Sequence, residues 1–224
     1  MERFVMMSAI SDGRLYERDD MVKADSLGCK GCSFCCENMC DTIVLDPYDI
    51  FQLTKALDKN FAALYKEELI EIGLHDLLTL PHIKDGGNGC RFLTDERRCG
   101  VYDARPGICR LFPLGRYYHD DTFSYFLQTH ECKVEDRGEV KVRDWLSIPE
   151  LEKYEEYVNT WHYFLKNLTE FMKESKDHEA KSRVNVMLLQ LFYEFPYNTN
   201  ADFFEQIGKR LSEWRKLGSI ELPV

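Results

Sequence analysis

The chain lacks any long hydrophobic run. None of its apolar stretches approaches the roughly 18–20 residues that a membrane-spanning helix needs. A short apolar run, Phe4 to Ile10, opens the sequence, but it soon turns acidic and has no small-residue cleavage site of a signal peptide. We therefore expect a cytoplasmic protein without a membrane segment, in a compartment that keeps thiols reduced.

Positive charge is also scarce. Lys and Arg together number 29 against 39 Asp and Glu, which gives a formal net charge of −10. Such a surface repels nucleic-acid phosphates and anionic lipids, so neither nucleic acid nor a membrane surface is expected as a partner. The chain has no internal repeat, no low-complexity tract and no pattern that supports a hydrolase triad.

Cysteine is what the chain has in excess. The segment GCKGCSFCCENMCD (28–41) holds five cysteines, and four more follow: Cys29, Cys32, Cys35, Cys36, Cys40, Cys90, Cys99, Cys109 and Cys132. An odd number in a chain without an export signal argues against a disulfide framework. The C-x-x-C-x-x-C spacing of the first three serves both tetrahedral zinc and cubane iron–sulfur clusters. A further ligand must then come from elsewhere in the chain.

The adjacent pair Cys35 and Cys36 adds a constraint. Neighbouring side chains leave the backbone in different directions, so both are not expected to ligate one mononuclear metal. Either the two cysteines serve separate centres, or one of them ligates and the other has a second task.

Two arginines flank Cys109 in the phrase YDARPGICR. Arg105 and Arg110 would place positive charge near a thiolate-rich centre, lower the cost of gathering the thiolates and tune a bound cofactor. The alternative is that both arginines pair with surface carboxylates such as Asp95 or Asp103.

Histidine offers little to a metal site. His130 lies two residues before Cys132 and is the spare ligand to consider. The other five histidines follow no metal-like spacing and are interpreted as ordinary polar residues: His75, His82, His119, His162 and His178.

Short elements are expected through residues 28–148. Asp46 and Pro47 predict an N-cap and a first helical turn, and a second helical stretch follows Asn60. The segment KDGGNG (84–89) predicts a loop, and CRFLTDERRCGVYD (90–103) predicts a hairpin with a cysteine on each arm. A second, aromatic hairpin is expected to turn at Asp120 and Asp121.

The last third of the chain changes character. From Pro149 on there is no cysteine, and apolar residues recur at helical spacing over 151–172, 179–195 and 201–217. These aromatic stripes are interpreted as core. We therefore expect an α+β fold with three parts. Residues 1–27 form a polar lead-in that is partly helical at most, 28–148 a metal-stapled cysteine module, and 149–224 a helical segment packed on the module or on a protein partner.

The ordered motifs C-x-x-C-x-x-C-C, CRFL and CGVYDARPGICRLFPLG, followed by a last cysteine, resemble the YkgJ-like cysteine-cluster family, whose members are described as zinc or iron chelators. The resemblance covers about residues 28–148 and implies eight metal ligands: Cys29, Cys32, Cys35, Cys36, Cys90, Cys99, Cys109 and Cys132. Cys40 lies outside that pattern, as a spare thiol or a replacement ligand. Flagellin lysine N-methylases carry a similar module, thought to hold a [4Fe–4S] cluster.

Three functions follow from these patterns. The cysteines do not divide into the two C-x-x-C knuckles of a zinc ribbon, whereas three clustered ligands and a remote one are typical of a cluster, so we favour a [4Fe–4S] protein. The alternatives are a structural zinc protein with a helical interaction tail, or a protein-lysine N-methylase-like enzyme. The chain has no glycine-rich methyl-donor loop after a strand pattern.

Overall fold

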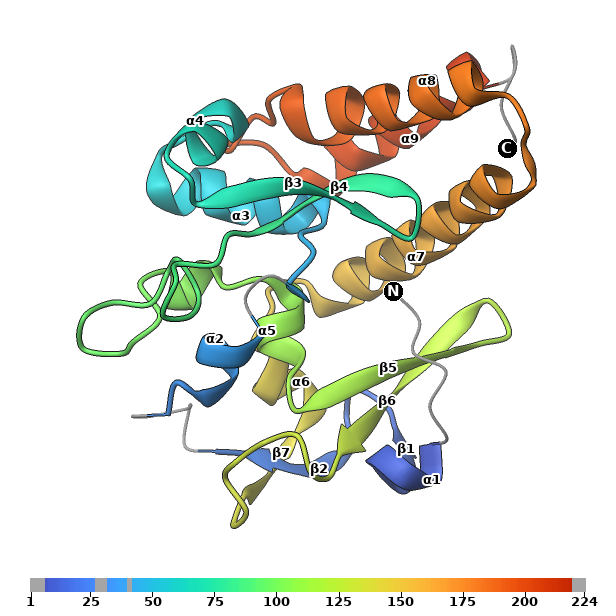
Figure 1. Ribbon diagram of the computed structural model, residues 1–224. Helices are drawn as coiled ribbons and strands as arrows, with labels where there is room; N and C mark the ends of the chain where they lie inside the picture. The colour runs from blue at the N-terminus through green and yellow to red at the C-terminus, as the bar shows by residue number, and fades with distance from the viewer. Residues whose placement is uncertain (1–6, 27–31, 40–41, 219–224) are drawn as a thin grey trace.

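The computed structural model describes residues 7–26, 32–39 and 42–218 (Figure 1). Cys29 and Cys40, both singled out in the sequence, lie outside the described residues. The helices are α1 (Met7–Ile10), α2 (Phe34–Asn38), α3 (Pro47–Leu57), α4 (Phe61–Lys66), α5 (Gly107–Leu111), α6 (Val142–Leu146), α7 (Leu151–Glu174), α8 (His178–Leu189) and α9 (Phe203–Gly218), with a 3-10 turn η2 (Tyr102–Ala104) and a π-helical turn η3 (Gln190–Glu194). The strands are β1 (Ser11–Tyr16), β2 (Met21–Asp25), β3 (Ile70–His75), β4 (Leu78–Ile83), β5 (Leu114–His119), β6 (Thr122–Gln128) and β7 (Gly138–Lys141).

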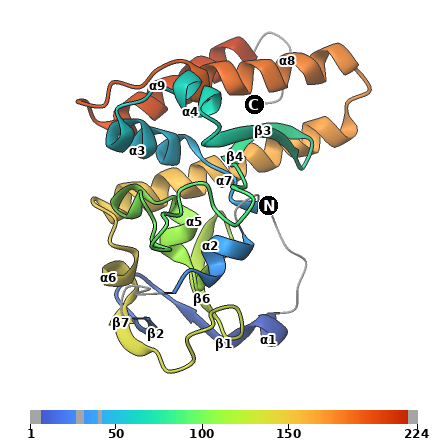
Figure 2. The ribbon, with the colours of Figure 1, turned by 60° about the vertical axis from the view of Figure 1, so that its left-hand side comes forward.

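The fold is α+β, as predicted. Helices α3, α4, α8 and α9 gather in the upper half of the molecule with the β3–β4 hairpin, and the other strands lie in the lower half (Figures 1 and 2). Helix α7 runs between the two halves in both views. The described strands form three small antiparallel sheets, in the orders β1-β6-β5, β2-β7 and β3-β4.

The N-terminal strands correct one expectation. Residues 1–27 were expected to be partly helical at most, yet β1 pairs with β6 and β2 pairs with β7. Tyr16 of β1 lies opposite Tyr125 and is buried. These segments become strands because partners from more than a hundred residues further along the chain supply the hydrogen bonds. No local pattern marks them.

Helix α3 begins where the sequence predicted. The Asp46 side chain accepts from the Asp49 backbone N–H, the Asp49 side chain accepts from the Asp46 N–H, and Pro47 occupies the first turn. Asn60 caps α4 in the same way by accepting from the Ala63 N–H. Helix α4 ends at Lys66, because the chain turns there and enters β3.

The aromatic stripes of the C-terminal segment are core, as predicted. Trp161 of α7 packs on Phe192 with ring centroids 5.0 Å apart, and Tyr157 packs on Phe203 at 5.1 Å. Tyr193 donates a hydrogen bond of 3.1 Å to the Leu45 carbonyl. The segment therefore packs on the rest of this chain.

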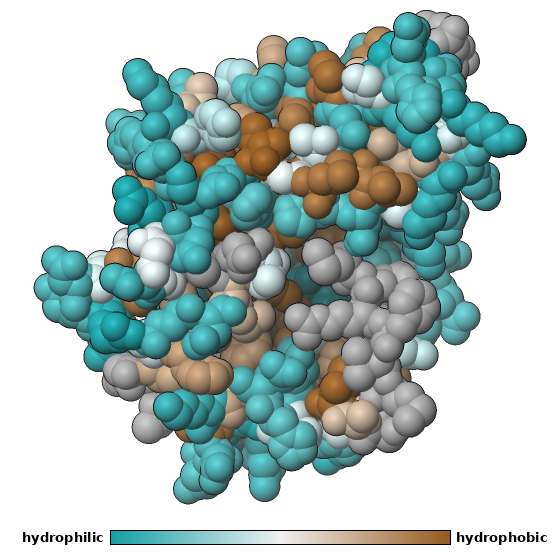
Figure 3. Space-filling view, viewed as in Figure 1, coloured by the Kyte–Doolittle hydropathy of each residue, from teal (hydrophilic) through white to brown (hydrophobic). Residues whose placement is uncertain are grey.

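Across the described residues, no helix is both long and apolar enough to cross a membrane. Figure 3 shows a face that is mostly hydrophilic, with hydrophobic side chains gathered in its upper half, where α8 and the β3–β4 hairpin lie. The exposed large hydrophobic residues of these elements are Leu74, Leu77 and Val186.

Candidate metal centre

Helix α2 carries Cys35 and Cys36 and is a single short turn. The Ser33 hydroxyl donates to the Glu37 carboxylate, and Glu37 also forms an ion pair with Arg97. The backbone N–H of Glu37 donates to the Ser33 carbonyl at 2.9 Å. Because α2 buries none of its residues, these polar contacts, rather than apolar packing, hold it in place.

The loop before Cys90 lies directly against α2. Gly89 has a φ of +117°, and a Cβ at this position would lie 2.9 Å from the Glu37 Cα and 3.0 Å from the Cys36 carbonyl oxygen. Only glycine fits both the conformation and the close approach. As a result the Cys90 backbone N–H donates to the Cys36 carbonyl at 2.6 Å, which places Cys90 beside Cys36.

Only part of the predicted hairpin around Cys99 is formed. Leu93 and Cys99 form one isolated antiparallel bridge, and the Gly100 N–H donates to the Phe92 carbonyl at 2.8 Å. Arg97 has a φ of +57° in the turn. The segment has no regular strands, so its two cysteines are placed by a tight turn.

Helix α5 carries Cys109 and is fixed at its first residue. The Gly107 N–H donates to Asp49 Oδ1 of α3 at 2.8 Å, and a Cβ at Gly107 would lie 2.0 Å from the Tyr154 hydroxyl of α7. Burial raises the pKa of the Cys109 thiol well above its usual range, and the nearby charge of Cys90 raises it further. One helix before Cys109 in the sequence and one after it thus position this cysteine.

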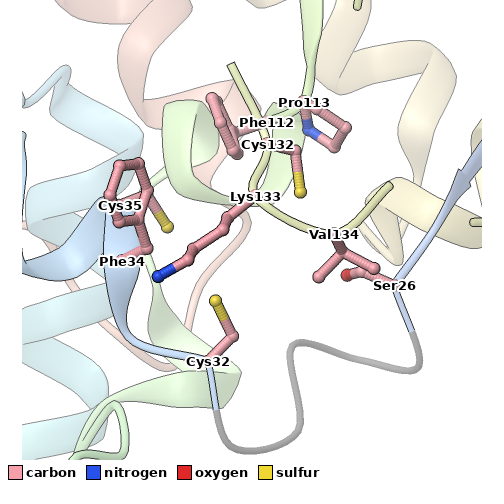
Figure 4. A pocket seen from close by; sticks show the side chains of 9 residues that line it. All are labelled: Ser26, Cys32, Phe34, Cys35, Phe112, Pro113, Cys132, Lys133 and Val134. Atoms are coloured by element: carbon pink, nitrogen blue, oxygen red, sulfur yellow. The ribbon is translucent and has the colours of Figure 1, made fainter. Parts of the chain in front are cut away.

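Cys132 shares a small hollow with the first cysteine segment. In Figure 4 the sulfurs of Cys32, Cys35 and Cys132 point toward a common space, into which the Lys133 side chain also extends. The cavity of about 20 Å³ has room for about one water molecule. It is lined by Ser26, Cys32, Phe34, Cys35, Phe112, Pro113, Cys132, Lys133 and Val134.

The side chains of the Cys35–Cys36 doublet influence each other's ionisation. The interaction with the Cys36 side chain lowers the pKa of Cys35 to about 6. The same interaction, followed by burial, raises the pKa of Cys36. Cys35 lines the hollow, whereas the Cys36 carbonyl accepts a hydrogen bond from the Cys90 N–H.

Together these contacts bring separate segments of the chain into one region. The described cysteines are all half-buried: Cys32, Cys35, Cys36, Cys90, Cys99, Cys109 and Cys132. In both ribbon views α2 and α5 lie side by side. Within the described part of the chain, no three Cys, His, Asp or Glu side chains are already placed to hold a metal ion. The donor set nevertheless fits a thiolate-bound metal in its chemistry, because gathered sulfur ligands suit zinc and iron–sulfur centres.

The two flanking arginines lie near Cys99. Burial raises the pKa of the Cys99 thiol, while the charges of Arg105 and Arg110 act to lower it. The Arg105 guanidinium lies 4.0 Å from the centre of the Tyr102 ring. Arg110 donates to the backbone carbonyls of Arg105, Ser147 and Asp103. Among the described residues, neither arginine forms the ion pair with Asp95 or Asp103 that was the alternative.

The residues that line the hollow around Cys132 differ in part from those that the sequence suggested. His130, considered there as a spare ligand, is exposed and does not line the hollow around Cys132. Lys133 and Phe34 do line it, with the Lys133 ammonium 5.5 Å from the Phe34 ring centre. Only the folded chain brings these two together, so a pattern of cysteines could not have found them.

The comparison with protein families agrees with this arrangement. Residues 28–133 match the CxxCxxCC family, described as a putative zinc- or iron-chelating domain. This segment carries the sequence pattern of the CxxCxxCC domain. The match confirms the resemblance seen in the sequence and contains all nine cysteines of the chain. The description of this family supports metal binding by the segment, with zinc or iron as the metal. No curated protein and no solved structure matches this chain.

Proposed function

We propose that the CxxCxxCC domain holds an iron–sulfur cluster, of the [4Fe–4S] type, through the cysteines of its family motif. The observation that carries this proposal is the gathering of half-buried thiols around α2 and α5. One [4Fe–4S] cluster takes four cysteine ligands. The candidates are Cys29, Cys32, Cys35, Cys36, Cys90, Cys99, Cys109 and Cys132.

The sequence and the fold both favour a cluster over a single zinc ion. Three cysteines at two-residue spacing and one remote cysteine form a common cluster ligand set. Cys132 is such a remote cysteine, since it faces the same hollow as Cys32 and Cys35. A bound cluster of this kind supplies one-electron redox chemistry.

Positively charged side chains near the cysteines also favour an iron–sulfur cluster. Several thiolates on one centre carry excess negative charge, and nearby positive charge lowers the cost of gathering them. Arg105 and Arg110 act on Cys99 in this way, and Lys133 extends into the hollow of Cys32, Cys35 and Cys132. These three side chains are proposed to stabilise and tune the cluster.

Metal and sulfide analysis of anaerobically purified protein tests the proposal. We expect iron and acid-labile sulfide in equal amounts, with a brown colour and an absorbance near ~400 nm that bleaches on reduction. Colourless protein with stoichiometric zinc and no sulfide would instead establish the structural zinc protein.

Single Cys→Ser variants then test the ligand set. Changes at Cys29, Cys32 and Cys35 are expected to abolish metal retention, because each removes a ligand from the shared spacing. Cys40→Ser is the matched control, since Cys40 lies in the same segment but outside the motif. Loss of metal in Cys40→Ser would overturn the assignment.

We further propose that the protein acts in the cytoplasm, where its thiols stay reduced. A protein partner bound through the C-terminal helices stays a prediction. Val186 of α8 and Phe195, which follows η3, are exposed hydrophobic residues of that segment. The division into parts at residues 28–148 and 149–224 also stays a prediction.

A further inference from the structure

The β3–β4 hairpin brings together two histidines that lie apart in the sequence. His75 and His82 are both half-buried, and His75 Nε2 lies 3.3 Å from His82 Nδ1. Their ring centroids are 5.1 Å apart, and the ring planes cross at 74°. The interpretation of these histidines as ordinary polar residues did not include this contact.

The distance between the nitrogens matches that of two ligands of one metal ion. Two imidazole nitrogens that each lie about 2.0–2.1 Å from a tetrahedral zinc ion are about 3.3–3.4 Å apart. Rings aimed at one shared ion would have centroids about 5.2 Å apart, whereas rings aimed straight at each other across this gap would have centroids about 5.6 Å apart. The observed 5.1 Å is closer to the first of these values.

Gly73 makes room for the pair. A Cβ at this position would lie 2.9 Å from His82 Cε1, 3.2 Å from His82 Nδ1 and 3.3 Å from His75 Nε2. Any other residue would therefore fill the space in which the two ring nitrogens meet. A glycine inside a strand weakens the strand, and here it allows the close approach of two side chains.

The electrostatic surroundings suit a cation. Burial and the neighbouring charge of His82 lower the pKa of His75, which favours the neutral imidazole that a metal requires. Asp76 follows His75, and Glu71 lies directly opposite His82 in the hairpin register. Lys84 Nζ lies 3.7 Å from Glu71 Oε1 and offsets part of this negative charge.

We propose that His75 Nε2 and His82 Nδ1 form a second metal site, which binds a divalent transition-metal ion such as Zn²⁺, with water completing the coordination. The ion replaces the proton that one of the two nitrogens carries when the rings hydrogen-bond to each other. The site lies on the β3–β4 hairpin and uses none of the cysteines, so it is independent of the cluster proposed above.

Imidazole ¹H–¹⁵N NMR of the full chain, purified with its cysteine centre loaded and titrated with zinc chloride, tests the site. We expect the ring nitrogens of His75 and His82 to shift together and to saturate. The rings of the other histidines should stay unchanged: His119, His130, His162 and His178. Zinc that leaves the two hairpin rings unshifted would overturn the proposal, whatever the cysteine centre holds.

Four variants sharpen the test. His75→Gln and His82→Gln should each weaken zinc binding at the hairpin about tenfold or more. His178→Gln, at an exposed residue of α8, should leave the binding unchanged. Gly73→Ala keeps both imidazoles but fills the space between them, so it should weaken binding as well. Undiminished binding in either His→Gln variant would overturn the site.

Discussion

The C-terminal helices and the cysteine-bearing segments are ordered by different means. Helix α7 extends over 24 residues and buries a stripe of large side chains that includes Trp161. Between β4 and β5 the longest helix, α5, has five residues, and α2 buries no residue at all. The helices are stabilised by apolar area removed from water. The cysteine segments bury fewer large side chains, among them Phe92 and Leu111, and depend more on hydrogen bonds and glycine contacts.

This difference indicates what a bound metal does for the fold. A segment with little apolar burial cannot offset the entropy of ordering its backbone. Metal ligation supplies that free energy in small metal-stapled modules. We therefore expect the metal to stabilise the cysteine segments locally, while the helical core stands on its own packing.

Removal of the metal should produce the largest difference in stability between the two regions. A chelator with a reductant should take away up to about 10 kcal/mol of ligation free energy, because the thiolates lose their shared centre. Amide hydrogen exchange is expected to lose protection over residues 84–113 while α7 keeps it. Equal loss of protection in both regions would contradict this separation.

Trp161→Ala should destabilise the helical region. Trp161 is buried against Phe164 and Phe192, so its removal leaves a cavity that costs about 3–5 kcal/mol. Urea unfolding followed by circular dichroism measures the loss, and metal content of the folded protein should not change. The matched control is Phe195→Ala, at an aromatic residue that is 65% exposed, with an expected effect within about 0.5 kcal/mol.

Gly107→Ala should disturb the contact between the two regions. The new methyl group would meet the Tyr154 hydroxyl, so we expect a loss of about 1–3 kcal/mol and weaker metal retention, because α5 carries Cys109. The double variant with Tyr154→Phe removes the colliding oxygen and should recover most of both losses. Tyr154→Phe alone is the control, since the hydroxyl also interacts with Arg116. No recovery in the double variant would place the cause elsewhere.

Gly208→Ala should have the smallest effect and the opposite sign. Gly208 lies inside α9, and a Cβ there has no neighbour within 4 Å. Alanine in a helix interior is more favourable than glycine by about 0.5–1 kcal/mol. Thermal unfolding should show a more stable protein with unchanged metal content, and a lower metal content would contradict the independence of the helical region.

Local chemistry made part of the fold predictable. Asp46 and Pro47 start α3, and Asp120 and Asp121 turn the β5–β6 hairpin with φ values of 47° and 59°. The β3–β4 hairpin gave no such signal. Its turn uses Leu77, with a φ of 70°, in place of the glycine or asparagine that marks tight hairpins. Strands β1 and β2 depend on pairing with distant segments, which a local pattern cannot show.

The sequence likewise predicted only part of the candidate site. Cysteine spacing identified the donor residues and their family, because cysteines at two-residue intervals in a reduced chain are typical of metal ligation. The approach of Cys90 to Cys36 depends on the conformation of Gly89. The position of α5 depends on Asp49 and Tyr154, which lie before and after this helix in the sequence. Contacts of this range exist only in the folded chain.

The close contact between Tyr154 and Gly107 has a consequence for when the metal centre can be completed during translation. The ribosome adds Cys109 forty-five residues before Tyr154, which corresponds to about 2 to 9 s of translation. During that interval every cysteine of the chain has been or is being made, but α5 lacks the helix against which it rests. Maturation of the complete centre therefore waits for a stretch of the chain that contributes no ligand to it.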